Sequence, residues 1–469
     1  MIPAAIDSAR ARRLRQLLAC MVVLLIFEGI ARKAAPSFLS IPIFLLKDAL
    51  TAWMAFYVVQ MRKNPIISSL WAAYILVAVL MIPLIILTAC YDPVLAVFGA
   101  KQYLLYPMVG FVTLMAFENV KWPIILDFYR KIAFLLIPIV VLALVQTRLP
   151  HNSWLNMSVH GESLEGFSSE GELRVSSTFP FVAQFCAFLN MEIFVIFIAM
   201  KDWTKQSLLW KVLTASLLPA ILVGSFVTGS RAAVAGNLAI LLLALLLGLF
   251  KFRASSIIHI LLVLIFLYLS LLVVNHFFPS VTFVYSNREQ GHLIGISEEI
   301  RGRVYQSFGI GHQTSYRSFL VGHGLGVMSN GVENISNYAA KWRTTLWTET
   351  DFGTTFFEGG LYLVLIWYGF RIFVILKTFK HFLFDTNSEF SVPMAFCQSF
   401  VIIMGLFGTL ALQPPIAIWW WLGVGTSLLF SWKCIAPAES EESMEKPGPP
   451  PRRKIRGRSL YADVIHSRK

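Results

Sequence analysis

The sequence predicts an all-helical, polytopic membrane protein with about 12 transmembrane helices. Of its 469 residues, 57% are hydrophobic and only 14% are charged, whereas soluble domains are about 45–50% apolar and about 25% charged. The mean hydropathy is +0.68. The apolar residues also gather in runs of about 20, the length that one transmembrane helix requires. These observations exclude a soluble enzyme and a disordered chain.

Twelve apolar segments are long enough to be spans. The first contains an apolar run, Leu17 to Phe27, that has the length of a signal-peptide core. Glu28, Arg32 and Lys33 follow it without a small-x-small cleavage pattern, so we expect a retained helix. The twelve segments centre near Met21, Ala49, Ala78, Met108, Ile139, Leu189, Leu218, Leu241, Leu264, Val364, Ile402 and Leu422.

The charge distribution predicts the orientation of these spans. If the N-terminus is cytoplasmic, the cytoplasmic segments hold about twice as many Lys and Arg as the outer ones, as the positive-inside rule requires. Both termini are then cytoplasmic. The predicted divisions are a basic N-terminus (1–15), helices 1–9 (16–276) with an outer loop at about 148–178, a large outer loop (277–352), helices 10–12 (353–433) and a disordered tail (434–469).

Charged residues inside the predicted spans are costly and therefore informative. They are Glu28, Lys47, Asp48, Glu118 and Glu192. Lys47 and Asp48 are adjacent and point in different directions on a helix, so we expect them to pair with other helices rather than with each other. Glu28 and Arg32, at i and i+4, can pair locally. We favour structural ion pairs or interfacial contacts for these residues over a transport relay.

The segment Thr228–Arg231 separates two apolar runs at the outer face of the predicted topology. Gly229 and Ser230 are expected to break the helix and to place Arg231 at the start of the next one, where free backbone N–H groups favour anions. A phosphate site and an Arg that anchors the helix at the lipid headgroups explain this segment equally well.

The long outer loop contains further candidates. Arg301, Arg303 and Arg317 precede a turn in which Gly322, Gly324 and Gly326 alternate with other residues, and such a turn can approach a ligand closely. Glu349, Asp351 and Glu358 follow within ten residues. Three carboxylates at a membrane surface indicate either catalysis or a solvated approach to the next helix, with Glu358 as an interfacial cap.

Other sequence patterns argue against a metal site, a serine hydrolase and a nucleotide-binding protein, and one pattern has two interpretations. The five cysteines and the scattered histidines have no spacing typical of a disulfide framework or a metal site. No nucleophile elbow or Walker motif is present. We therefore expect no metal and no cofactor, and no nucleic acid partner. Trp419–Trp421 indicate either a sugar-stacking surface or an interfacial aromatic belt.

Four of these stretches together resemble the bacterial O-antigen ligase and polymerase (Wzy-like) family, in particular an exopolysaccharide-polymerase-like branch. They are Phe27–Lys33 with the following Pro36, Thr228–Arg231, Arg303 placed 19 residues before Gly322 and its turn, and Glu349–Gly359. The last stretch departs from the ligase pattern, because Glu349 and Thr350 stand where ligases carry His-Asn. This departure favours a polymerase and makes His323 an alternative base.

The resemblance implies a GT-C-like membrane glycosyltransferase that polymerises undecaprenyl-diphosphate-linked repeat units into exopolysaccharide or O-antigen at the periplasmic face of a bacterial inner membrane. The large outer loop (277–352) would then be periplasmic. Arg231 and Arg303 would hold the diphosphate, with Arg301 or Arg317 assisting. Glu349 would be the base, with Asp351 and His323 as further catalytic candidates. The implied partners are the lipid-linked glycan donor and acceptor, membrane lipids, a chain-length regulator and a flippase. These residue types suit the implied reaction, because a guanidinium binds phosphate oxygens in pairs and a carboxylate or imidazole accepts the proton of the acceptor hydroxyl.

Two alternatives stay open. An O-antigen ligase that transfers finished glycan to lipid A core or to a protein would use the same residues. A lipid-linked glycan flippase or transporter would instead need charges at the midplane and two related halves. The suggestive charges lie mostly at one predicted surface, so we favour group transfer over transport.

Overall fold

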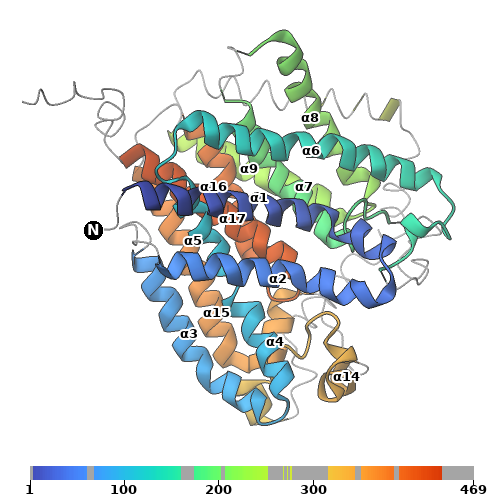
Figure 1. Ribbon diagram of the computed structural model, residues 1–469, viewed down its shortest axis with the longest axis vertical. Helices are drawn as coiled ribbons and strands as arrows, with labels where there is room; N and C mark the ends of the chain where they lie inside the picture. Colours follow the sequence, from blue (N-terminus) through green and yellow to red (C-terminus); the bar gives the residue numbers. More distant parts are fainter. Residues whose placement is uncertain are drawn as a thin grey trace, which may run out of the picture.

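The computed structural model describes residues 4–60, 68–159, 174–201, 206–251, 315–343, 350–384 and 390–435, together with residues 268, 272, 275 and 276. Throughout this part of the chain the regular structure is helical (Figure 1). The helices form one bundle with an extensive apolar core. The predicted all-helical class is therefore confirmed for the described residues.

The helices are long, as membrane-spanning helices must be. Within the described residues, eight are long and apolar enough to cross a bilayer, or nine if a bent pair counts as one span. The expected number of twelve is thus not confirmed, although every predicted centre except Leu264, which lies outside the described residues, falls in a helix. The eight are α1 (Ala4–Ala34), α2 (Ser37–Gln60), α3 (Ser68–Ala89), α6 (Trp122–Arg148), α7 (Val182–Ala199), α8 (Leu208–Val227), α9 (Arg231–Lys251) and α15 (Asp351–Phe384).

The segment predicted as one span around Met108 is in fact two helices. They are α4 (Pro93–Leu104) and α5 (Pro107–Phe117), and they meet at 41°. Pro107 is the first residue of α5, where its missing N–H costs nothing, but it cannot continue the hydrogen bonding of α4. Asp92 caps α4 by accepting hydrogen bonds from the N–H groups of Val94 and Leu95.

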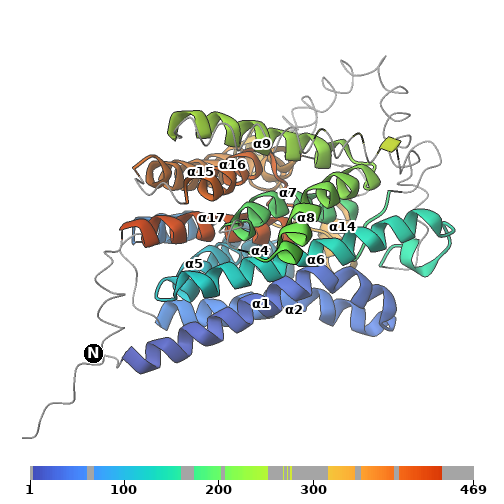
Figure 2. The same ribbon diagram turned by 90° about the horizontal axis from the view of Figure 1, so that it is seen from above.

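The helices lie in layers (Figure 2). The hairpin of α1 and α2 forms one edge, α9 lies along the opposite edge, and α7 lies between them with α17 (Pro414–Ile435). α16 (Ser391–Phe407) packs against α9, α17 and α7. Small residues let α5 and α17 approach closely, because a Cβ on Gly425 would lie 2.5 Å from the carbonyl oxygen of Gly110.

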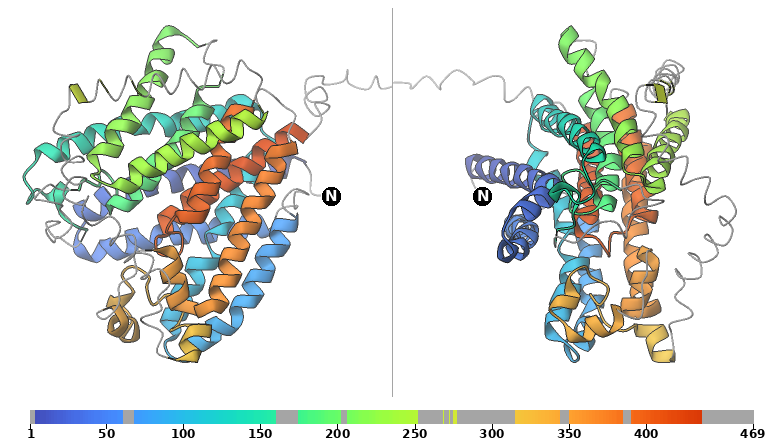
Figure 3. Two further views of the ribbon diagram at one scale, coloured as in Figure 1. Left: turned by 180° about the vertical axis from the view of Figure 1, so that it is seen from behind. Right: turned by 90° about the vertical axis from the view of Figure 1, so that its right-hand side faces the viewer.

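Successive spans alternate in direction when α4 and α5 are counted as one bent span, so the connections after α1, α3, α6, α8 and α16 lie at one end of the bundle (Figures 1 and 3). We call this the loop end. Residues 315–343 pack there and carry two short helices, α13 (Tyr316–Val321) and α14 (Asn337–Arg343). On the predicted topology the loop end is the outer end, and it holds every described candidate residue of the site.

Candidate functional site at the loop end

A cavity of about 420 Å³ opens at the loop end, within the size range of about 300–1,000 Å³ typical of ligand pockets. Its polar lining groups come from the connections, the helix starts and, for Asn190, the middle of α7. Its apolar wall comes from α7, the first turns of α9 and the end of α16. The polar lining residues are Arg174, Asn190, Ser230 and Thr409, and the apolar ones include Ala235, Gly236, Ala239, Met404 and Phe407.

The segment Thr228–Arg231 forms one side of the cavity mouth. The helix breaks there as predicted: α8 ends at Val227, Gly229 has a positive φ of 58°, and Arg231 is the first residue of α9. Thr228 Oγ1 accepts a hydrogen bond from the N–H of Ser230 at 3.0 Å. Ser230, which is buried, and Ala232 line the cavity, and Arg231 between them in the sequence is partly exposed.

Residues 174–181 form a strap that enters the bundle and brings Arg174 to the cavity. Ser177 has a positive φ of 51°, a conformation that costs energy for a residue with a Cβ. Gln146 holds it there, since its Oε1 accepts from the N–H of Ser177 at 2.8 Å. Gly29 makes room for the strap, because a Cβ at this position would lie 2.1 Å from the carbonyl carbon of Phe179. This contact explains the glycine in the Phe27–Lys33 stretch.

Asn190 of α7 contributes an unusual group to the cavity lining. Its side chain is 5% exposed, and its Oδ1 has no hydrogen-bond partner among the described residues. Gly236 leaves it space, since a Cβ on Gly236 would lie 2.7 Å from the Asn190 amide nitrogen. A buried acceptor without a donor is costly, so this oxygen is available to a ligand donor.

Asp351 does not have the surroundings of a catalytic base. Its carboxylate forms a buried ion pair with Arg371 and accepts the N–H of Ala411 at 2.6 Å. Arg371 also donates to the carbonyl oxygens of Gly405 (2.7 Å) and Gly408 (3.2 Å). Because Gly408 lines the cavity, the pair fixes one cavity wall. We therefore assign Asp351 a positioning role rather than the catalytic role that the sequence suggested.

The glycine turn packs against the start of α15. Gly322, Gly324 and Gly326 all have positive φ, at 66°, 123° and 80°, which confirms the permissive turn. Glu358 is fully buried and holds the turn, because its carboxylate accepts from the N–H of Met328 (2.9 Å) and from the hydroxyl of Tyr103 (2.7 Å). Glu358 is therefore a buried residue that fixes this turn by hydrogen bonds, and not the interfacial cap that the sequence suggested.

His323 lies in an aromatic setting. Its ring centroid is 4.3 Å from that of Trp342 and 4.5 Å from that of Phe357. Its Nε2 is buried and has no hydrogen-bond partner within the described segments. Burial lowers the pKa of His323, so the imidazole is held in the neutral form that a general base requires.

Arg317, the remaining described arginine candidate, donates a hydrogen bond to the hydroxyl of Tyr91. Tyr91 stacks on Tyr338 with the centroids 5.5 Å apart. Arg301, Arg303 and Glu349 lie outside the described residues.

Two candidate regions therefore result, the cavity beside Arg231 and the turn that carries His323. The first turns of α15 connect them. Asp351 pairs with Arg371, which donates to Gly408 of the cavity wall, and Phe357 contacts His323.

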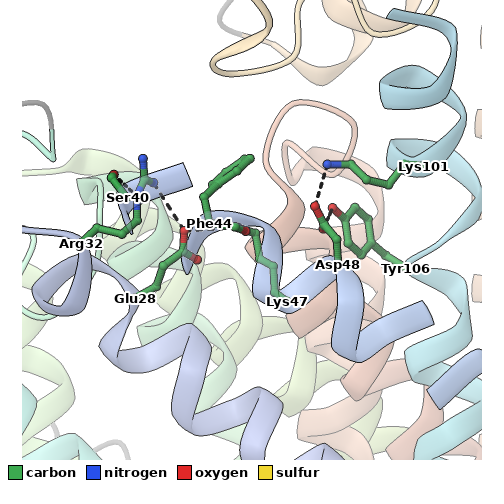
Figure 4. Close-up of polar contacts among 8 residues, drawn as sticks. All are labelled: Glu28, Arg32, Ser40, Phe44, Lys47, Asp48, Lys101 and Tyr106. Atoms are coloured by element: carbon green, nitrogen blue, oxygen red, sulfur yellow. Dashed lines mark hydrogen bonds and ion pairs between the residues drawn. The ribbon is translucent and has the colours of Figure 1, made fainter. Parts of the chain in front are cut away.

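The charges inside the spans pair largely as expected. Glu28 contacts Arg32, Lys47 pairs with Glu28 on the neighbouring helix, and Asp48 pairs with Lys101 of α4 (Figure 4). Glu118 is different: it is the C-cap of α5 and lies at the helix end rather than inside a span. Glu192 is fully buried, and neither carboxylate oxygen has a partner among the described residues.

The side chains of Trp419–Trp421 are at most 1% exposed. They form neither a sugar-stacking surface nor an interfacial belt. Instead they pack in the core, where the Nε1 of Trp420 donates to the carbonyl oxygen of Val401 at 2.9 Å.

Sequence reasoning missed three functional candidates. Arg371 lies within the tenth predicted span, where the rule for intramembrane charges applies and could have identified it. Arg174 and Asn190 gave no comparable signal, because only the tertiary structure brings the strap and α7 to the same cavity.

The fold and the cavity define a multi-pass membrane protein with an amphipathic cavity at one end of its bundle. Comparisons of the chain with protein-family models, with curated proteins and with solved structures gave no match. Among the described residues, no group of three His, Cys, Asp or Glu side chains could hold a metal ion.

Proposed function

We propose that the protein is a metal-independent membrane glycosyltransferase that polymerises undecaprenyl-diphosphate-linked repeat units into exopolysaccharide or O-antigen at the outer face of a bacterial inner membrane. The cavity at the loop end is the observation that carries this proposal. Polar side chains and a larger apolar surface line it together, so its lining offers partners for both the diphosphate and the hydrocarbon of a polyprenyl diphosphate.

The mouth is suited to an anion. Arg174 lines it, Arg231 stands beside it, and α9 begins there. The first N–H groups of a helix have no partner within the helix, and the helix dipole favours negative charge at this end. The diphosphate would bind between the two guanidinium groups and the start of α9.

The wall is suited to an isoprenoid chain. Ala235, Gly236 and Ala239 present little side-chain volume, while Met404 and Phe407 close the cavity from α16. Ala235 is exposed, so the cavity is open on the α9 side. A lipid could therefore enter between these helices without unfolding them.

The proposed reaction breaks the bond between the anomeric carbon and the diphosphate oxygen of the donor. The acceptor hydroxyl forms the new glycosidic bond, its proton passes to a base, and the electron pair stays on the diphosphate. Cationic groups at the mouth stabilise that developing charge. Glu349 and His323 are the candidate bases. Asp351 is no longer one, since Arg371 and the Ala411 N–H occupy its carboxylate.

Complementation of a deletion strain tests the proposal. Ala235→Phe would fill the cavity, and Arg231→Ala would remove a diphosphate contact. Both variants should abolish polymer while the protein remains in the membrane. Leu238→Phe, a matched substitution on the exposed side of α9 (Leu238 is 53% exposed), should support normal polymer.

The lipid-linked intermediate separates the candidate activities. Single repeat units should accumulate in the deletion strain if the protein is a polymerase, whereas finished lipid-linked polymer would indicate a ligase. Accumulation on the cytoplasmic side would indicate a flippase. Normal polymer from both Ala235→Phe and Arg231→Ala would refute the cavity assignment.

A further inference from the structure

A second charged cluster lies between α1, α2 and α4 (Figure 4), and none of its residues lines the cavity. It contains Glu28, Arg32, Lys47, Asp48 and Lys101. Lys47 is fully buried and Glu28 is 1% exposed. The side chains of Arg32 and Lys101 reach the edge of the cluster and are 10% and 16% exposed.

The contacts leave the positive groups in excess. One oxygen of Glu28, Oε1, receives both Lys47 Nζ at 3.2 Å and Arg32 Nη1 at 3.4 Å. The other oxygen, Oε2, is buried and has no partner in the described parts of the chain. Both oxygens of Asp48 are engaged, since it accepts from Lys101 at 2.8 Å and from the Tyr106 hydroxyl at 2.7 Å. Three cations thus face two carboxylates, a net charge of +1.

Geometry keeps the three cations together. All of them lie over one aromatic ring, that of Phe44, at 3.6 Å for Lys47, 5.2 Å for Arg32 and 5.7 Å for Lys101. Cation–π contact supports each charge but neutralises none of them. An uncompensated charge in a low-dielectric interior is costly, so an anion at this cluster would be strongly favoured.

The position of the cluster indicates which anion. Arg32 is two residues before the end of α1, and Ser40, which accepts a hydrogen bond from Arg32 Nε at 3.1 Å, is in the first turn of α2. Both are therefore near the level of lipid headgroups. Phe38 and Ile41 are 73% and 61% exposed beside them. The α1–α2 hairpin also forms an edge of the bundle (Figure 2).

We infer that this cluster is a binding site for the phosphate of an anionic membrane lipid. The Arg32 guanidinium contacts the phosphate, the Lys101 ammonium on the other side of the Phe44 ring adds to the positive potential, and the exposed apolar residues of α2 contact the lipid chains. A phosphodiester carries one negative charge, which balances the excess of one positive charge. Lys47 and Glu28 fix the positions of these groups rather than contact the lipid. This site is separate from the proposed diphosphate cavity and does not depend on it.

Thermal unfolding of the purified protein in detergent tests the inference. Phosphatidylglycerol should raise the Tm in a saturable manner, and phosphatidylcholine, which has no net charge, should not. Arg32→Gln, which brings the net charge to zero, should weaken the apparent affinity for phosphatidylglycerol at least about tenfold, because it removes a charge-assisted hydrogen bond. Arg32→Lys should retain most of the affinity.

Controls separate the possible outcomes. Lys131→Gln removes an exposed cation that pairs with Asp127 and should leave the response unchanged. If Arg32→Gln does not fold, Lys101→Gln provides the same change in charge. Equal responses to the two lipids, or equal responses from Arg32→Gln and Lys131→Gln, would overturn the inference. Inorganic phosphate that alone reproduces the full shift would overturn the assignment to a lipid.

Discussion

The ion pair between Asp351 and Arg371 gives the sharpest test of which carboxylate serves structure and which serves chemistry. Asp351→Asn keeps the shape of the side chain and removes its charge. Asn has one acceptor oxygen for the two donors that Asp351 serves, Arg371 and the Ala411 N–H. Arg371, which is fully buried, then keeps only neutral acceptors, among them the carbonyl oxygens of Gly405 and Gly408. Breaking a buried pair on one side costs about 3–5 kcal/mol, because the remaining charge is uncompensated.

We therefore expect Asp351→Asn to lower the free energy of unfolding by about 3–5 kcal/mol and to lower the Tm in detergent clearly. Lys131→Gln, in an exposed pair, should cost less than about 1 kcal/mol. Polymer formation should fall together with stability in Asp351→Asn, because the segment that carries Gly408 loses its anchor at the cavity wall.

A double variant completes the test. Asp351→Leu combined with Arg371→Met replaces the buried pair by apolar side chains and should recover much of the lost stability. If Asp351 only positions the cavity wall, part of the activity should return as well. A stable Asp351→Asn protein without any activity would refute this reasoning and would return Asp351 to the catalytic candidates.

Two further predictions concern the turn that precedes α15. Gly326→Ala should destabilise the protein by more than about 2 kcal/mol, because its Cβ would lie 2.7 Å from the backbone nitrogen of Gly99 in addition to the cost of a positive φ. Gly331→Ala is the matched control, because Gly331 also has a positive φ (82°) but no atom lies within 4 Å of the added Cβ. It should lower the free energy of unfolding by only about 1 kcal/mol, measured by thermal unfolding. Equal costs for the two variants would contradict the packing argument. The pKa of His323 is lowered by burial, so the unfolded chain binds more protons, and stability should be complete above about pH 6.5 and decline below it. The difference in Tm between pH 7.5 and pH 5.5 should therefore be smaller in His323→Phe than in the unchanged protein. In His151→Gln it should equal that of the unchanged protein. An equal difference in His323→Phe would disprove the link between His323 protonation and stability.

The sequence by itself determined the helical class and several local features. Hydropathy places helices at every described span centre, because each helix must satisfy its own backbone in a bilayer. The pairing of Glu28 with Arg32 follows from their i, i+4 spacing. The break at Gly229 and the start of α9 at Arg231 follow from the glycine and the serine between two apolar runs.

Only the tertiary structure decided what each polar group faces. Trp419–Trp421 have an interfacial composition, yet α17 lies inside the bundle and buries them. Asp351 looked catalytic until folding placed Arg371 beside it, 20 residues later. Arg174 reaches the cavity because a strap enters the bundle beside Gly29. Local sequence fixes backbone hydrogen bonding and helix direction, whereas the burial and pairing of a charge depend on which distant helices pack against it.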